Sequence, residues 1–283
     1  MAGQEQAPGR LRAAGLVQKL ASTGLNVTDL GDLTEVTFSP DPENPKLQNL
    51  DKVLGVIAEV TDAVDSAVRS NHWPLVTGGD CSITIGVLAA LVKHYPDFGL
   101  VYLDGDVDLN TPETTLSGVI DGMVIAHVVG WGADELRKFG PQCPLLNQRD
   151  IALFGYSVQA GGLDPVEIEL LGREQLLRYP LGQIVGDVAG AARNALSRIE
   201  NTTEKFLVHF DVDVIDFHEF PAVDFPHRPG LTLTQTIEAL RVFVGSPNAA
   251  GLVVTEFKAD QDPDGSLAQT LVYAIQSALE MRL

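Results

Sequence analysis

The chain has 283 residues, of which 45% are hydrophobic, and a formal net charge of −19 at pH 7. This charge argues against a nucleic-acid groove or an anionic membrane as the partner, because both need clustered Lys and Arg side chains. The acidity instead favours a cationic ligand. Gly and Pro residues are evenly spread along the sequence, which predicts one domain over residues 1–283.

The cysteine content and the N-terminal residues point to a cytoplasmic protein. Cys81 and Cys143 are too few for a disulfide framework. The first residues lack the basic and apolar regions of a signal peptide. No apolar run approaches the roughly 20 residues that are needed to cross a bilayer.

Short apolar runs alternate with longer stretches of helical periodicity, a pattern that predicts an α/β fold with a mainly parallel sheet. Strands are predicted at residues 26–30, 74–77, 100–103, 151–154, 206–210 and 252–255. Helical stripes of apolar residues cover 50–68, 184–199 and 267–279.

Four segments that follow predicted strands are rich in potential metal ligands, and ligands bind beyond the carboxyl ends of strands in open α/β sheets. They are Gly-Gly-Asp-Cys-Ser at 78–82, Asp-Gly-Asp-Val-Asp at 104–108, Asp-Val-Asp at 211–213 and Thr-Glu-Phe at 255–257. A single Asp at such a place is usually a helix cap or turn former. Five aspartates at two adjacent strand ends repel one another unless cations lie between them. Two divalent ions about 3.5–4 Å apart are one standard solution.

Other motif classes do not fit these segments. A calcium loop would need glycine where Leu109 stands and glutamate where Thr115 stands. The chain also lacks a phosphate-binding loop and a dinucleotide-binding glycine motif.

Together, the motifs resemble those of the arginase/agmatinase family, the ureohydrolases, over almost the whole chain. Residues 78–82 resemble the family's Gly-Gly-Asp-His-Ser motif, residues 104–112 resemble Asp-Ala-His-x-Asp-x-Asn-Thr-Pro, and residues 210–216 resemble Phe-Asp-Val-Asp-x-x-Asp-Pro. The resemblance implies a three-layer α/β/α fold, two manganese ions, hydrolysis of guanidino compounds to urea and an amine, and a homotrimer or homohexamer. The family's first strand should precede Pro8, where the chain has only seven residues, so this strand is expected to be missing or replaced.

The same resemblance implies two sets of metal ligands. One ion would be held by Cys81, Asp104, Asp108 and Asp211. The second ion would be held by Asp104, Asp106, Asp211 and Asp213.

The resemblance also implies roles in substrate binding and proton transfer. Glu256 corresponds to the carboxylate that holds the guanidinium group, and carboxylates suit that group by charge and by bidentate geometry. Asn110 and Ser117 match arginase rather than agmatinase and would bind the α-carboxylate of an amino acid. Asp121 corresponds to the histidine that shuttles protons. For the α-amine, the acidic candidates are Asp164 and Glu167.

Several positions depart from the family pattern. Cys81 and Asp106 stand where the family has metal-binding histidines, and a thiolate ligand shifts the preference toward zinc. Asp121 can replace the shuttle histidine only if burial or nearby charge raises its pKa toward the working pH. The remaining histidines near the motifs are expected to be solvated or core residues rather than substitute shuttles: His127, His218 and His227.

Two functional hypotheses follow from these residues. The first is a metal-dependent hydrolase of a small cationic guanidino amino acid, of the arginine or N-hydroxyarginine type. The second is a catalytically inactive arginase-fold protein that acts as a binding or regulatory subunit, since the lost histidines are what drift without activity would produce. Glu256 and four family metal aspartates remain in register, which favours the enzyme.

Overall fold

The computed structural model describes residues 2–158, 165–173 and 175–283. Six strands of the described chain form one parallel sheet in the order β1-β6-β5-β2-β3-β4. The strands are β1 Leu75–Thr77, β2 Phe98–Leu103, β3 Ile151–Phe154, β4 Leu177–Tyr179, β5 Lys205–Asp211 and β6 Ala249–Thr255. The central strands are buried along nearly their whole length, as expected for a parallel sheet that is covered on both faces.

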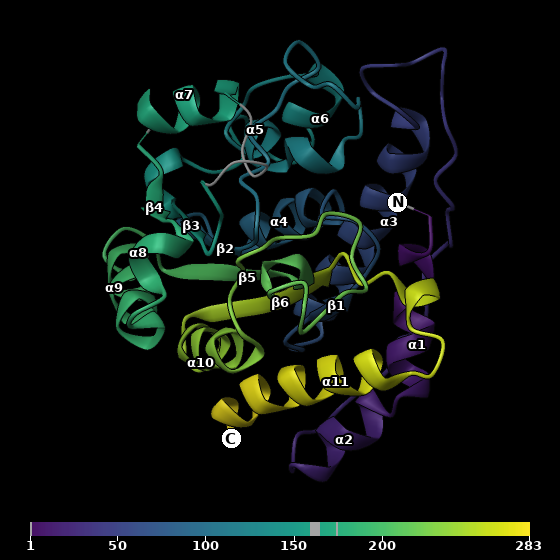
Figure 1. Ribbon diagram of the computed structural model, residues 1–283, viewed down its shortest axis with the longest axis vertical. Coiled ribbons are helices and arrows are strands. Elements are labelled where there is room, and N and C mark those ends of the chain that lie inside the picture. The colour runs from purple at the N-terminus through teal and green to yellow at the C-terminus, as the bar shows by residue number, and fades with distance from the viewer. Residues whose placement is uncertain (1, 159–164, 174) are drawn as a thin grey trace.

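Helices cover both faces of this sheet (Figure 1). The longer helices on one face are α3 Leu50–Arg69 and α4 Ile83–His94, together with α5 Val124–Val128. The other face is covered by α1 Ala7–Ala13, α2 Leu16–Ser22, α9 Val188–Glu200, α10 Leu233–Val244 and α11 Ser266–Leu279. The remaining α-helices are α6 Asp134–Arg137, α7 Pro165–Arg173 and α8 Leu181–Ile184. This arrangement confirms the predicted three-layer α/β/α fold.

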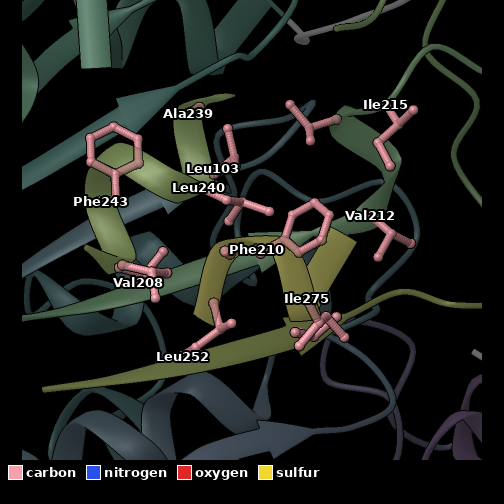
Figure 2. Packing of buried hydrophobic residues seen from close by; sticks show 14 of the residues in the cluster. Leu103, Val208, Phe210, Val212, Ile215, Ala239, Leu240, Phe243, Leu252 and Ile275 are labelled. Atoms are coloured by element: carbon pink, nitrogen blue, oxygen red, sulfur yellow. The ribbon is translucent and has the colours of Figure 1, made fainter. Parts of the chain in front are cut away.

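The two helical layers pack closely on the sheet. Gly86 of α4 lies against the backbone of α3, where an added Cβ would come within 2.5 Å of the Ile57 carbonyl oxygen. On the opposite face, Phe210 of β5 packs in a cluster with Leu240, Phe243 and Ile275 from α10 and α11 (Figure 2). The strand ends that carry the motifs are therefore held on a rigid base.

Two local predictions differ from the structure. Residues 26–30 form no strand: Leu30 is 70% exposed, and Arg12 pairs with Asp29 at the surface. Alternation of apolar residues here reflects one side chain, Val27, that packs on the core while its neighbours face solvent. The stripe over 184–199 is interrupted, because the Asp187 side chain accepts a hydrogen bond from Gly190 N and starts a new helix.

No helix in the described part of the chain combines the length and the apolar character that a membrane span requires.

Candidate metal centre

The segments that carry the motifs meet at the carboxyl edge of the sheet. Strands β1, β6, β5 and β2 are consecutive neighbours, so the turns that follow them lie side by side. Glu256 N donates to Gly79 O at 2.9 Å, which ties the end of β6 to the Gly-Gly turn after β1. Gly105 N donates to Asp213 Oδ1 at 3.1 Å, which joins the turns after β2 and β5.

A cavity of about 270 Å³ lies at this edge, near the lower end of the range for small-molecule sites. It is lined by the ten residues that the sequence assigned to metal binding, to the guanidinium and α-carboxylate groups and to proton transfer: Cys81, Asp104, Asp106, Asp108, Asn110, Ser117, Asp121, Asp211, Asp213 and Glu256. Among the described residues the lining contains no Lys or Arg, and its only histidine is His227. The cavity is therefore strongly acidic.

A first group of possible ligands surrounds the buried thiol of Cys81. Its Sγ atom lies 2.9 Å from Asp211 Oδ2, 4.0 Å from Asp104 Oδ2 and 3.4 Å from His209 Nε2. One ligand atom from each of these four residues lies within 4.8 Å of the others. Burial raises the pKa of the Cys81 thiol, and the charges of Asp211 and other carboxylates raise it further. In the absence of a metal ion the thiol is therefore protonated.

His209 lies within β5 and was not singled out from the sequence. Its Nδ1 atom is 2.8 Å from Thr84 Oγ1, and its ring stacks on Tyr102 with the centroids 4.1 Å apart. Burial lowers the pKa of His209 to about 3, so the imidazole is neutral, which is the form that binds metals. The Nε2 atom is left facing Cys81.

A second group consists of Asp106, Asp213 and His227, whose ligand atoms also lie within 4.8 Å of one another. His227 Nε2 is 3.2 Å from Asp106 Oδ2 and 3.7 Å from Asp213 Oδ2. Burial by itself lowers the pKa of His227, but the two carboxylates outweigh it and raise this pKa to about 11. Without a metal ion, His227 is the cation of this acidic cavity.

Asp108 joins neither group in the described part of the chain. Its carboxylate accepts a hydrogen bond from the Tyr102 hydroxyl, and its backbone has a φ of 46°. This left-handed conformation is unusual for a residue other than glycine and is typical of functional sites. The first group therefore contains His209 and lacks Asp108, which the family correspondence assigns to the same ion.

The electrostatics of the cavity fit divalent metal ions. Burial raises the pKa values of Asp104, Asp108 and Asp211 well above their usual range, and mutual repulsion between the carboxylates raises them further. Such a cluster is stable only when it is protonated or when cations neutralise it. Carboxylate, imidazole and thiolate groups are all ligands of divalent transition metals.

Asp121 and Glu256 lie next to the first group. Asp121 Oδ1 accepts a hydrogen bond from Cys81 N at 2.8 Å, and burial together with the charge of Asp80 raises the pKa of Asp121 to about 7. Glu256 is 1% exposed, and its Oε2 accepts a hydrogen bond from the Gln4 side chain. Its Oε1 has no hydrogen-bond partner in the described structure. Glu256 thus holds one buried carboxylate oxygen ready for a cationic ligand.

Three further polar residues, Asn110, Ser117 and Glu167, line the same cavity. Asn110 Oδ1 accepts a hydrogen bond from Thr114 Oγ1 at 2.9 Å, and Ser117 Oγ accepts one from Val119 N at 3.2 Å. Glu167 is buried and accepts a hydrogen bond from Leu109 N at 3.2 Å. Asp164, the other acidic candidate, lies outside the described residues.

The model of the arginase family matches residues 1–281. The chain belongs to the arginase family. As a member, it is a metal-dependent hydrolase of the class that acts on carbon–nitrogen bonds in linear amidines.

Individual arginases resemble the chain along almost its whole length. The arginase of Brevibacillus brevis is 28% identical over 284 residues, which cover 99% of this chain and 93% of the relative. The crystal structure of Bacillus caldovelox arginase has a TM-score of 0.91 at 26% identity, and that of Bacillus cereus arginase has a TM-score of 0.89 at 28% identity. Each superposition covers 98% of this chain and 92% of the solved chain.

The sequence motifs did not single out His209, and they predicted a passive role for His227. A signal for His209 exists, because side chains two residues apart on a strand face the same side, and His209 precedes Asp211 by two. The sequence contains no comparable signal for His227, because a loop separates it from Asp213 and the spacing of the two residues does not predict that they meet. In the structure it is neither a solvated nor an apolar core residue, since it lies at the second group.

His127 and His218 behave as expected from the sequence. His218 is exposed and contacts Asp216, with its Nδ1 2.8 Å from Oδ1. His127 is buried: its Nδ1 lies 2.8 Å from Met123 O, and its Nε2 accepts a hydrogen bond from Ala133 N at 3.2 Å. These contacts require a neutral ring, and neither residue lines the cavity.

The neutral ring of His127 predicts acid sensitivity. Burial lowers its pKa to about 4, whereas the unfolded chain has the ordinary value of 6.5. Because the unfolded state binds the proton first, the stability from His127 is complete above pH 6.5 and is lost as the pH falls toward 4. At pH 5 the loss is about 2 kcal/mol.

His127→Gln keeps a donor and an acceptor but does not titrate. Urea unfolding at pH 7.5 and pH 5 should therefore show a loss of stability that is smaller in this variant than in wild type by that amount. His72→Gln, at an exposed site, is the control and should behave as wild type. Equal losses in wild type and His127→Gln would contradict the prediction.

Proposed function

We propose that this chain hydrolyses a guanidino amino acid, of the arginine or N-hydroxyarginine type, and releases urea or a urea analogue. The observation that carries the proposal is one acidic cavity lined by Glu256 and by residues of both groups of metal ligands: Cys81, Asp104 and Asp211 from the first, and Asp106, Asp213 and His227 from the second. The likeness to arginases supports the same substrate class. Action in the cytoplasm as a homo-oligomer is part of this proposal.

The metal would be held by the motif residues. One ion would bind Cys81, Asp104, Asp108 and Asp211, with His209 as an added donor, and the second would bind Asp104, Asp106, Asp211 and Asp213. Divalent ions held in this way supply Lewis-acid activation of water at neutral pH. Manganese is expected from the family resemblance, and zinc is the alternative because Cys81 and His209 are softer donors.

Glu256 would bind the guanidinium group of the substrate. Its Oε2 already accepts a hydrogen bond from the side-chain amide of Gln4, and a guanidinium group offers the same kind of N–H donor to both oxygens. Burial strengthens this charge pairing by excluding water. The pair would orient the guanidinium carbon toward the metal ligands.

Asn110, Ser117 and Glu167 would select an amino acid over a simple amine. The first two offer side-chain donors for the α-carboxylate, and Glu167 offers a negative charge for the α-amine. All three line the same cavity as Glu256. This set of groups supports an arginine-like substrate rather than a decarboxylated one.

Asp121 would manage the proton on the leaving amine. Its pKa of about 7 meets the condition for a general acid–base catalyst at neutral pH, since both protonation states are then populated. Burial is the main cause of this shift, and the negative charge of Asp80 adds to it. A carboxyl group would thus do the work that the family assigns to histidine.

Metal analysis and a urea-release assay test the proposal together. Purified protein, stripped with chelator and reloaded with Mn²⁺ or Zn²⁺, should bind close to two ions per chain and release urea from arginine or N-hydroxyarginine. Absence of both metal binding and urea release would rule out the hydrolase. Tight metal binding without urea release from either substrate would support the inactive binding or regulatory subunit instead.

A further inference from the structure

We infer that His227 is a ligand of the second metal position, together with Asp106 and Asp213. This inference rests on the proposed metal-dependent function and assigns a donor that the family motifs do not contain. His227 would supply from a distant loop the imidazole that the motif lost when Asp106 took the place of histidine.

The position of His227 is built into the fold. The loop after β5 closes on itself, since Asp216 N donates to Leu231 O at 2.7 Å and Phe217 N donates to His227 O at 3.1 Å. This closure brings the ring to the cavity, where His227 is 7% exposed. Loop geometry therefore holds the imidazole against the turn after β2.

The Nε2 atom of His227 points to a ligand that is not part of the protein. It is buried and has no hydrogen-bond partner in the described structure, although oxygens of Asp106 and Asp213 lie 3.2 Å and 3.7 Å away. Without a metal ion, the two carboxylates hold this nitrogen only in an ion pair that lacks hydrogen-bond geometry. Two carboxylates and one imidazole that converge from three turns form a donor set typical of divalent transition metals.

Gly105 supports this assignment independently. A Cβ atom at this position would come within 2.3 Å of His227 Cδ2, so only glycine lets the ring lie against this turn. The family motif has alanine here, directly before the histidine that Asp106 replaces. The two neighbouring departures from the motif therefore belong together: Asp106 removes one imidazole, and Gly105 makes room for another.

An imidazole donor also suits the charge of the site. The ligands carried over from the motifs are all anionic once Cys81 binds as a thiolate. A neutral imidazole adds a donor without adding negative charge, and it gives up its proton when the metal binds. His227 thus raises the number of ligands where another carboxylate would add repulsion.

Metal titration of the stripped protein by calorimetry, at fixed pH with Mn²⁺ alone, tests the assignment. Wild type should bind two ions, and His227→Gln should bind one of them more weakly by more than the roughly 10- to 100-fold that loss of an outer-shell partner costs. His218→Gln, in the same loop but exposed, should match wild type. Circular dichroism and thermal unfolding in chelator establish that each variant is folded.

A rescue variant keeps the test decisive if His227→Gln is poorly folded. Gly105→Ala combined with Asp106→His and His227→Ala restores the family motif and should recover binding of the second ion. Wild-type affinity for both ions in His227→Gln would overturn the inference and leave the proposed function intact. Tighter binding would also overturn it, because His227 would then be a cation that competes with the metal. Failure of wild type to bind any ion would reject the inference together with the proposed function.

Discussion

Replacing Asp211 with asparagine is expected to abolish binding of the ion at the Cys81 group and to lower kcat/KM for urea release by at least about 10³-fold. Asp211 is 2% exposed, its Oδ2 is the carboxylate oxygen 2.9 Å from Cys81 Sγ, and its Oδ1 accepts a hydrogen bond from Asp213 N at 2.8 Å. The family correspondence places it in both ligand sets. Asp104 is the other residue that this correspondence places in both ligand sets.

The stability of Asp211→Asn separates a metal role from a structural one. Burial and the charges of Asp213 and Asp104 raise the pKa of Asp211 and so disfavour its ionised form in the stripped protein, where a neutral asparagine costs little. Without metal, the variant should unfold at a temperature equal to or above that of wild type. With Mn²⁺ added, wild type should gain thermal stability and the variant should gain little.

Asp216→Asn is the matched control for this experiment. Asp216 follows Asp211 by five residues and binds His218 and Gly230 outside the cavity. It should retain metal binding and turnover. If Asp211→Asn binds two ions as tightly as wild type, the ligand assignment of the whole first group is wrong.

The fold and the acidic part of the site could be predicted because both depend on local patterns. Each motif aspartate follows a buried strand, and parallel topology brings these strand ends to one edge. The missed strand β4, Leu177–Tyr179, is only three residues long and has no clear period. The false strand at 26–30 shows the opposite error, since a short alternation also occurs in a segment that runs along the surface.

The imidazole part of the site depends on tertiary structure. In the sequence, His209 looks like one more residue of a buried strand. In the structure, the contacts of its ring with Tyr102 and Thr84 direct its Nε2 toward Cys81. The position of His227 depends on the closure of a loop, and no periodic pattern in the sequence predicts that closure. The departures from the motif at Gly105 and Asp106 are visible in the sequence, but only the folded chain brings them together with His227.

Replacing Glu256 with glutamine is expected to lower kcat/KM by about 10²- to 10⁴-fold while both metal ions stay bound. A buried charge pair that loses one partner costs about 3–5 kcal/mol, and each 1.36 kcal/mol is a factor of ten in rate. The fold should tolerate the change, because the amide oxygen introduced there still accepts a hydrogen bond from Gln4. The guanidinium group would lose the negative charge and one of the two acceptor oxygens, because the amide nitrogen introduced there is a donor.

Metal titration and kinetics together decide what Glu256 does. Cys81, Asp121 and Glu256 also form a group with ligand atoms within 4.8 Å of one another, so a metal role for this carboxylate is the competing hypothesis. Loss of an ion in Glu256→Gln would support that hypothesis and remove the argument for a guanidinium site. Retained metal with unchanged kcat/KM would exclude both roles.

Glu238→Gln, at an exposed site on α10, is the control for loss of one negative charge. Retained metal with a large fall in kcat/KM is expected, because Oε2 of Glu256 already accepts a hydrogen bond from the Gln4 amide, the kind of N–H donor that a guanidinium group offers.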